Sequence, residues 1–217
     1  MPLLAYCMME AGAGVDTPLA GVGGARVEEL QESGLRCFFS RFESREHLSR
    51  IPALESALAF HQVVQALFCH AGLISFRFPT LVENEEELLQ YLREHASRYT
   101  SELSRLRHMV QMEVHISSPE PAKDRPSASG REYLQQRQAR AAGLEAAAEK
   151  FRQTAGDLVV EWRERTTGEG MRCYALLHRD AVTAFRSTTQ ELRQSLPGTR
   201  LSGPWPPAEF SEAIKES

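Results

Sequence analysis

The chain has little lysine, an almost balanced charge and no long hydrophobic run, and each of these limits what it can be. Three lysines stand against 22 arginines among 217 residues, and the formal net charge is −4. This balance gives no electrostatic footprint for nucleic acid. No apolar stretch approaches the roughly 20 residues that cross a bilayer. We therefore expect a soluble, cytoplasmic protein with neither a nucleic acid nor a membrane as partner.

The cysteines are widely spaced, and they form neither a C-x-x-C pair nor a zinc-like pattern. Three of the four lie in apolar runs: the cysteines are Cys7, Cys37, Cys69 and Cys173. Buried, reduced cysteines are typical of cytosolic proteins. The first residues also lack the basic flank of a signal peptide. We expect no disulfide framework and no metal site.

Common catalytic motifs are missing as well. The sequence contains no G-x-S-x-G, no S-x-x-K, no P-loop and no H-E-x-x-H or H-x-x-E-H pair. The glycines at 21–24 lack the G-x-G-x-x-G spacing of a dinucleotide loop. For an enzyme, Arg77 and His61 would be the only candidates. We predict a protein without catalytic activity and without a cofactor.

What the sequence does contain is a mixture of short strands and amphipathic helices, which predicts an α+β fold. The first half shows three short apolar runs separated by glycine-bearing turns, then a helix, a strand and a long helix capped by Asn84. The predicted strands are 3–9, 26–30, 35–40 and 73–82, and the predicted helices are 53–70 and 85–107.

Two features of this half carry specific expectations. In the helix at 53–70, we expect an inward stripe that also includes His61; its apolar members are Leu54, Leu58, Val64 and Phe68. In the strand at 73–82, Pro79 predicts a bend or bulge. Arg77 is the one charged residue on this predicted buried strand. It must pair with a carboxylate or with carbonyl groups, or else be an exposed recognition arginine.

The second half has the element order strand, helix, strand, strand, helix, strand. Its first strand shows apolar residues alternating with polar ones over 109–116, the period of a half-buried strand. The further strands are predicted at 158–163, 171–177 and from 199 on, and the helices at 131–155 and 180–196. This order is that of the split βαβ, ferredoxin-like plan, whose antiparallel sheet has the order 4-1-3-2. The last strand would then lie at a sheet edge.

We place a domain boundary where the long helix ends, near Arg107. Residues 1–107 would form a separate N-terminal α+β layer, and 108–217 a ferredoxin-like domain with a proline-rich C-terminal strip. The polar, proline-bearing loop at 117–129 would lie inside the second domain. No internal repeat is strong enough to indicate that the halves are duplicates.

The most unusual stretch is Gly203-Pro204-Trp205-Pro206-Pro207. Prolines fix φ, remove backbone donors and hold the preceding residues extended, so this segment is a stiff strip with Trp205 at its centre. Two interpretations are open. The strip is a strap whose tryptophan fills a gap in the core, or it docks on a partner, because such segments lose little entropy on binding.

This strip, followed by Phe210, resembles the C-terminal signature of the gas vesicle protein GvpF/GvpL family, although Ala208-Glu209 replace the usual Tyr-Ser. The segment 76–80 is similar to the family's arginine-phenylalanine-glycine-threonine segment, with Pro79 in place of glycine. The segment 130–134 is similar to its glycine-x-x-tyrosine-leucine helix start. The glycine loop at 21–24 and the helix around His61 also match in order.

The family comprises minor proteins of gas vesicles, whose wall is a polymer of a small, very hydrophobic shell protein. The resemblance implies a non-enzymatic protein that assists vesicle assembly by contacting the shell protein and other gas vesicle proteins. It would act in the cytoplasm or at the gas-facing inner surface of the shell. As family-motif residues with a partner-contact or structural role, the resemblance marks Arg77, Phe78, Thr80, Gly130, Tyr133, Leu134, Gly203, Pro204, Trp205, Pro206, Pro207 and Phe210.

The residues alone leave one alternative from another class. A ferredoxin-like domain can also serve as a small-molecule-binding or regulatory module with no connection to gas vesicles. A thermal-shift response to metabolites would favour such a module, whereas neighbouring short reading frames for a hydrophobic shell protein would favour the gas vesicle interpretation.

Overall fold

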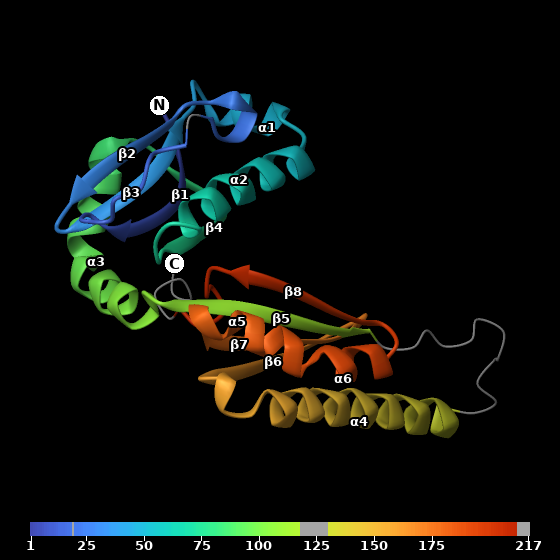
Figure 1. Cartoon of the computed structure of the whole chain (residues 1–217). Coiled ribbons are helices and arrows are strands. Elements are labelled where there is room, and N and C mark those ends of the chain that lie inside the picture. The colour runs from blue at the N-terminus through green and yellow to red at the C-terminus, as the bar shows by residue number, and fades with distance from the viewer. Residues whose placement is uncertain (19, 118–129, 212–217) are drawn as a thin grey trace. The chain divides into compact units, whose positions relative to one another are not determined.

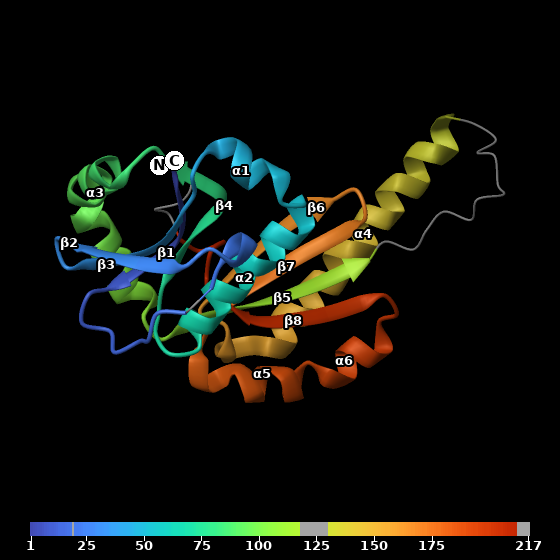
Figure 2. The same ribbon diagram turned by 90° about the horizontal axis from the view of Figure 1, so that it is seen from above.

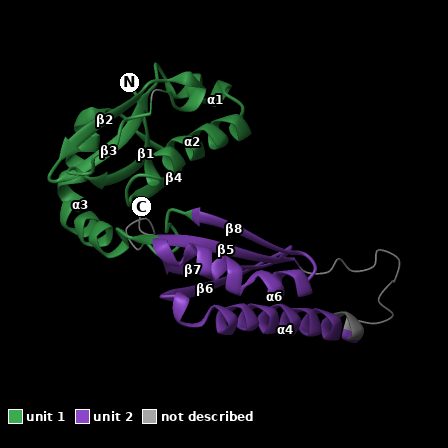
Figure 3. Ribbon diagram, in the orientation of Figure 1, with its two compact units in different colours: residues 1–109, 205–217 green, residues 110–204 purple. Residues whose placement is uncertain are grey.

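The computed structural model describes residues 1–18, 20–117 and 130–211, without the side chains of residues 130, 132 and 133. The chain divides into two compact units (Figure 3). Unit 1 comprises Met1–Met109 and Trp205–Ser217, and unit 2 comprises Val110–Pro204. The division differs from the expected one at the tail, which belongs to unit 1 although it follows the last strand of unit 2. None of the described helices is long and apolar enough to cross a bilayer.

Unit 1 is built on a four-stranded antiparallel sheet in the order β2-β3-β1-β4 (Figure 1). Its strands are β1 (Leu3–Glu10), β2 (Val27–Glu32), β3 (Leu35–Arg41) and β4 (Ile74–Val82). Its helices are the 3-10 turn η1 (Val22–Gly24), α1 (Arg45–Arg50), α2 (Ala53–Phe68) and α3 (Glu85–Leu106). The α+β prediction is confirmed for this unit. The short helix α1 was not predicted, because six residues are too few to show apolar periodicity.

Strands β1 and β3 are buried along almost their whole length, since helices cover both faces of the sheet. Leu3 and Met8 of β1 belong to one core cluster with Leu88 and Tyr99 of α3. In a regular strand, two residues five positions apart would point to opposite faces. A shift in strand register between Ala5 and Cys7 brings them to the same face. On the other face, Phe60 of α2 packs on the ring of Tyr6, with centroids 5.2 Å apart.

The predicted inward face of α2 is only partly correct. Val64 and Phe68 are buried, but Leu54 is 74% and Leu58 is 55% exposed, and His61 is exposed too. The prediction fails because only one of the helix's 16 residues, Glu55, is charged. Without a charged face, apolar periodicity does not say which side points inward. The buried residues of α2 are Ser56, Phe60, Val63, Val64, Leu67 and Phe68.

In the connection from β1 to β2, η1 is the longest helical element among the described residues 11–18 and 20–26. Hydrogen bonds from buried side chains on the sheet hold this loop. The hydroxyl oxygen of Tyr6 accepts a bond from the Val22 amide at 3.0 Å and lies 2.9 Å from Oγ of Ser40. Ser40 in turn donates to the carbonyl of Arg26 at 2.9 Å. Because the Ser40 hydroxyl proton is used in the bond to Arg26, the Tyr6 hydroxyl must donate to Ser40. Every polar group in this series of hydrogen bonds therefore has a partner.

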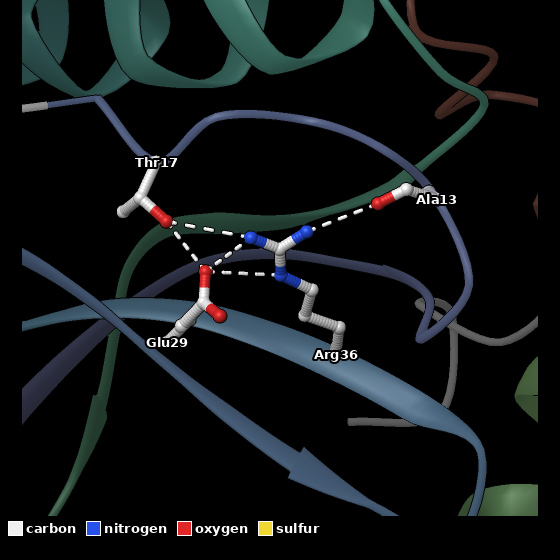
Figure 4. Close-up of polar contacts among 4 residues, drawn as sticks. All are labelled: Ala13, Thr17, Glu29 and Arg36. Atoms are coloured by element: carbon white, nitrogen blue, oxygen red, sulfur yellow. Dashed lines mark hydrogen bonds and ion pairs between the residues drawn. The ribbon is translucent and has the colours of Figure 1, made fainter.

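Arg36 on β3 holds the earlier part of the same loop (Figure 4). Its guanidinium donates to the carbonyl of Ala13 at 3.1 Å and to the Glu29 carboxylate through Nε at 3.0 Å. Thr17 donates to the same carboxylate oxygen. Arg36 is only 9% exposed, so its charge is largely buried, whereas its counter-ion Glu29 stays in contact with solvent. The loop is thus fixed to the sheet at both of its halves.

Unit 2 contains the second four-stranded sheet, in the order β6-β7-β5-β8 (Figure 2). Its strands are β5 (Met109–Ser117), β6 (Glu161–Thr167), β7 (Gly170–His178) and β8 (Thr199–Trp205). Its helical elements are α4 (Gly130–Ala155), η2 (Gly156–Leu158), η3 (Arg179–Ala181), α5 (Val182–Thr188) and α6 (Gln190–Ser195). Read from β8, this is the predicted order 4-1-3-2, and β8 lies at the edge.

Unit 2 departs from the sequence-based elements in three places. The strand predicted from 158 begins at Glu161, because Gly156 takes a positive φ of 49° and starts η2. The single helix predicted over 180–196 is divided at Thr189, whose hydroxyl donates to the carbonyl of Phe185 at 2.7 Å. On α4, Leu144, Ala148 and Phe151 are buried as predicted, but Leu134 is 57% exposed. Of the loop predicted at 117–129, Ser117 is the last residue of β5, and residues 118–129 lie outside the described part of the structure.

The hydrogen bonds by which Tyr6 and Ser40 hold the loop between β1 and β2 predict that glycine is required at position 21. An alanine Cβ there would lie 2.1 Å from the Tyr6 hydroxyl oxygen and 3.0 Å from Oγ of Ser40. We expect Gly21→Ala to separate Tyr6 from Val22 and to lower the free energy of unfolding by about 1–3 kcal/mol, the cost of leaving a buried group unsatisfied. Urea denaturation measures this. Gly12→Ala in the same loop is the control, because no atom lies within 4 Å of its Cβ position.

The Arg36–Glu29 pair predicts a pH dependence of stability. Burial raises the pKa of Glu29, but the hydrogen bonds from Thr17 and Arg36 and the charge of Arg36 outweigh it, so the pKa is lowered. A lowered folded-state pKa gives stability that is present above the unfolded pKa and is lost as the pH falls through the folded value. We expect Glu29→Gln to be less stable than wild type at pH 7. In urea titrations, the difference in free energy of unfolding between wild type and Glu29→Gln should become smaller towards pH 3. A difference that does not depend on pH would contradict this assignment.

Candidate functional site

The family-like segment 76–80 forms an irregular stretch of β4, which is an edge strand of the first sheet. Ala5 pairs with Thr80 and Cys7 with Ser75, so four residues of β4 stand opposite Tyr6 alone. The Phe78–Pro79 peptide bond is cis, and the Thr80 hydroxyl donates to the carbonyl of Arg77 at 2.6 Å. The bulge predicted at Pro79 is therefore confirmed.

The segment does not bury its arginine. Arg77 is exposed, so the expected pairing inside a buried strand is wrong. The bulge explains the difference, since it turns these residues away from the regular alternation of the strand. Phe78, by contrast, is half-buried and packs edge-on against Phe60 of α2, with ring centroids 5.3 Å apart. Of these two family-motif residues, Arg77 thus faces solvent, whereas Phe78 packs against α2.

Arg77 and Thr80 come together in a groove of about 640 Å³ between β4 and α3. The rest of the lining combines apolar and aromatic side chains with carboxylates and an amide: Phe76, Leu81, Val82, Glu87, Leu88, Gln90, Tyr91, Glu94 and Tyr99. A pocket of this size, lined by apolar and aromatic side chains together with several polar groups, is a candidate binding site. We call it the β4–α3 groove.

The aromatic residues of α3 form the part of the groove that sequence analysis missed. The hydroxyls of Tyr91 and Tyr99 are 2.5 Å apart, and His95 stacks on Tyr91 with ring centroids 4.3 Å apart. These residues follow each other at a spacing of four, which places them on one helix face. That spacing was the available signal. It did not show that β4 lies opposite.

The carboxylates of Glu87 and Glu94 and the amide of Gln90 have ordinary structural partners. Glu87 accepts a bond from the Glu83 amide at 2.8 Å, and its own amide donates to the capping Asn84 at 3.0 Å. Glu94 accepts a bond from Gln90 at 2.8 Å. The acidic first turn of α3 therefore stabilises the positive end of the helix, as predicted. The groove offers one guanidinium, carboxylates and phenols to a ligand.

None of the described cysteines lines the β4–α3 groove. Cys7, Cys37 and Cys173 are buried, whereas Cys69 at the end of α2 is exposed. Burial raises the pKa of the Cys37 thiol to about 12. Burial, helped by Glu164, raises the pKa of the Cys173 thiol to about 12 as well. Among the residues that the structure describes, no three His, Cys, Asp or Glu side chains are close enough to hold a metal ion.

The C-terminal strip begins at a glycine that cannot be replaced without strain. Gly203 has a φ of +112°, and an added Cβ would lie 2.8 Å from the carbonyl oxygen of Gln111. Arg186 donates to the Gly203 carbonyl at 2.5 Å, and the bond from Gly203 to Pro204 is cis. These features fix the end of β8 and the start of the strip.

Beyond the glycine, the strip is a strap, but Trp205 is not its buried anchor. Pro206 and Pro207 are buried, Phe210 is fully buried, and Trp205 is only half-buried. Arg105 of α3 donates to the carbonyl of Phe210 at 2.7 Å, which fixes the strap to unit 1. Trp205 meets His61 of α2 edge-on, with ring centroids 5.1 Å apart.

The remaining family-motif residues lie on α4. The helix starts at Gly130, as the resemblance implies, and Leu134 in its second turn is exposed. The side chain of Tyr133 lies outside the described part of the structure. The twelve residues therefore occupy three regions: the β4–α3 groove with its neighbouring bulge, the strap and the start of α4.

These features define a two-unit α+β protein whose candidate sites are binding surfaces: a groove beside an edge strand, and a proline-rich strap. The family model described as gas vesicle synthesis protein GvpL/GvpF matches residues 2–212. The chain therefore belongs to the GvpL/GvpF family, as its motifs indicated. No curated protein sequence matches the chain.

Two solved structures show the same fold. The gas vesicle protein GvpF from Anabaena sp. PCC7120 is similar with a TM-score of 0.71 at 16% identity, over 97% of this chain and 96% of that chain. GvpF from Microcystis aeruginosa is similar with a TM-score of 0.70 at 14% identity, over 97% and 99% of the two chains. The likeness extends over both units.

The strap geometry predicts which of its aromatic residues stabilises the fold. We expect Phe210→Ala to lower the free energy of unfolding by about 3–5 kcal/mol, as for other fully buried phenylalanines. Trp205→Ala should cost clearly less, because its side chain is half-buried. Urea denaturation of the two variants compares them directly. Equal losses, or a larger loss for Trp205→Ala, would show that the tryptophan is the anchor after all.

Proposed function

We propose that this chain is a minor gas vesicle protein that assists vesicle assembly by contacting the hydrophobic shell protein and other gas vesicle proteins. In this proposal it acts by binding alone, without catalysis or a cofactor. The observation that carries the proposal is the family match over residues 2–212, which spans both units and the C-terminal strap.

The physical problem that such a protein would solve is exposure of the shell subunit. A subunit that polymerises into a wall must present strand edges and apolar surface beforehand, which is an aggregation hazard. A partner with open sheet edges and apolar side chains can cover these surfaces temporarily. In this chain, β4 and β8 are edge strands.

We place one contact at β8 and the segment Gly203–Pro207. An edge strand can accept a further strand through its unpaired backbone groups, whereas Pro204 has no amide hydrogen to donate. A partner strand could therefore pair along Thr199–Ser202 and would stop at the strip. This arrangement limits the contact to a few residues, which suits a reversible association.

The family also supports a location at gas vesicles, and the proposal includes the gas-facing inner surface of the shell. Flotation of intact vesicles from a vesicle-forming cell separates bound from cytosolic protein. Protease treatment of the floated vesicles then distinguishes the two surfaces, because an inner protein is protected until the shell is collapsed. Membership of a gas vesicle family argues against the alternative of a module unrelated to gas vesicles.

The role of the strip is tested by its tryptophan. We expect Trp205→Ala to reduce the shell protein captured by a tagged chain during coexpression, while the chain stays folded. Trp162→Ala is the matched control, because this second tryptophan lies on β6 of unit 2, away from the strip in sequence. If Trp205→Ala changes neither stability nor the capture of any gas vesicle protein, the tryptophan of the strip neither stabilises the fold nor contacts a partner.

A further inference from the structure

The two edge strands of the unit 1 sheet are protected in different ways. An edge strand presents unpaired N–H and C=O groups, and proteins guard such edges with charges, prolines or bulges. Three of the six residues of β2 are glutamates, whereas β4 carries one charged residue among nine, Arg77. The protection of β4 is instead the bulge with Pro79, which interrupts the edge. The regular segment Thr80–Val82 beyond the bulge remains open to a further strand.

This segment forms one wall of the β4–α3 groove. Neighbouring side chains of a strand point to opposite faces, yet Thr80, Leu81 and Val82 all line the groove. Three consecutive residues share a groove where it runs along the edge of their strand. On its other side the segment pairs with β1, and none of the described strands pairs with its outer edge. The groove therefore has unpaired backbone groups along this wall.

The opposite wall is one face of α3. Its exposed residues follow the spacing i, i+3 and i+7, which places them in one row: Glu87, Gln90 and Glu94. Between the walls, Leu88 and Tyr99 are buried. Phe76 of β4 meets Tyr91 of α3 there, with ring centroids 6.4 Å apart. An open strand edge beside an apolar floor suits an extended peptide, which gains affinity from main-chain hydrogen bonds and specificity from its alternate side chains.

One charge of the groove has no partner in the described structure. The sheet of unit 1 contains three arginines, and both of those on β3 pair with glutamates: Arg36 and Arg41. Arg77 forms no ion pair with any residue that the structure describes. The Thr80 hydroxyl donates to the Arg77 carbonyl at 2.6 Å, so the backbone that carries this guanidinium is fixed. A bulge that re-aims a side chain is common beside functional sites.

The charges of the two walls determine the sign of the ligand and its orientation. A guanidinium binds a carboxylate through two parallel hydrogen bonds. The carboxylates of Glu87 and Glu94 lie on the α3 wall, where each accepts a hydrogen bond from the protein. They repel a ligand carboxylate from α3, whereas Arg77 attracts it to the β4 wall. An acidic side chain of the ligand is therefore placed beside β4.

We infer that the β4–α3 groove binds an extended peptide segment of another protein, in which an acidic side chain stands among apolar ones. The backbone of this segment pairs with Thr80–Val82 as an added strand, its carboxylate meets Arg77, and its apolar side chains cover Tyr91. The groove volume of about 640 Å³ suits a short segment and not a folded domain. The site lies on a different strand from the contact proposed at β8, and it does not depend on the proposed function.

The test measures the binding of synthetic peptides to the full chain by fluorescence polarisation with a neutral fluorophore. The acidic probe is Thr-Val-Thr-Glu-Val-Thr-Val with blocked ends, and the neutral probe has glutamine in place of the glutamate. A third probe keeps the glutamate but has methylated backbone nitrogens, which prevents strand pairing. We expect the acidic probe to bind about tenfold more tightly than either of the others, the size expected for losing one hydrogen bond to a charged group.

Variants of the chain test each wall. Arg77→Gln should weaken binding of the acidic probe about tenfold and remove its preference over the neutral probe. Glu94→Gln should tighten it about twofold, because a like charge is removed, and a damaged fold would not bind more tightly. Arg50→Gln is the control, since this exposed arginine ends α1 and does not line the groove. It should bind like wild type.

Amide hydrogen exchange tests the binding mode. The acidic probe should slow exchange within Thr80–Val82, because an added strand accepts hydrogen bonds from the outer edge of β4. The methylated probe should not. Slowed exchange confined to other elements would contradict the assignment to this groove.

The remaining outcomes separate the peptide from other occupants. If the acidic probe shows no preference over the neutral one, or keeps its preference in Arg77→Gln, the inference is overturned. If glutarate alone displaces the probe as well as unlabelled peptide does, the groove is a site for small anions and the added strand is wrong. If the chain is a dimer in light scattering and Arg77→Gln makes it monomeric, a second copy occupies the edge and the inference is wrong. The capture of gas vesicle proteins is measured apart from these experiments, so the proposed function stands or falls separately.

Discussion

The buried hydrogen-bond chain from Val22 through Tyr6 and Ser40 to Arg26 is the constraint on which unit 1 depends. It places the polar groups of Tyr6 and Ser40 among buried apolar residues of β1 and β3, and such groups are tolerated only when fully satisfied. The backbone of the loop from β1 to β2 satisfies these groups through Val22 and Arg26. Arg36 holds the earlier half of the same loop through the carbonyl of Ala13. With the loop fixed, η1 contacts α2 and Phe60 rests on Tyr6, so the position of α2 follows from this network.

The two sheets solve the same topological problem in different ways. Both have the order second, third, first, fourth in terms of their own strands. In unit 2 the first crossover contains the long helix α4, as in the ferredoxin-like plan. In unit 1 the loop between β1 and β2 takes the place of this helix. A helix covers a sheet with apolar side chains, whereas a loop must be held by specific polar contacts, which explains the glycine at position 21.

Local patterns in the sequence predicted most elements but few of the contacts between them. Alternation and turn residues located the strands, and Asn84 located the start of α3. The face of α2 was misassigned because one charge in 16 residues does not distinguish its sides. The stiffness of Gly203–Pro207 was readable, yet which aromatic enters the core depends on packing, and Phe210 does so instead of Trp205. The groove joins two elements, and its aromatic spacing was visible on α3 alone.

Unit 1 is assembled from both ends of the chain, since Trp205–Ser217 belongs to it and Phe210 is buried in it. During synthesis the N-terminal strands leave the ribosome first, but their packing partner Phe210 leaves only after the whole of unit 2. Unit 2, which is continuous in sequence, is complete earlier. Unit 1 therefore closes only after unit 2 has been synthesised, and translation products that stop before Phe210 lack it in its final form.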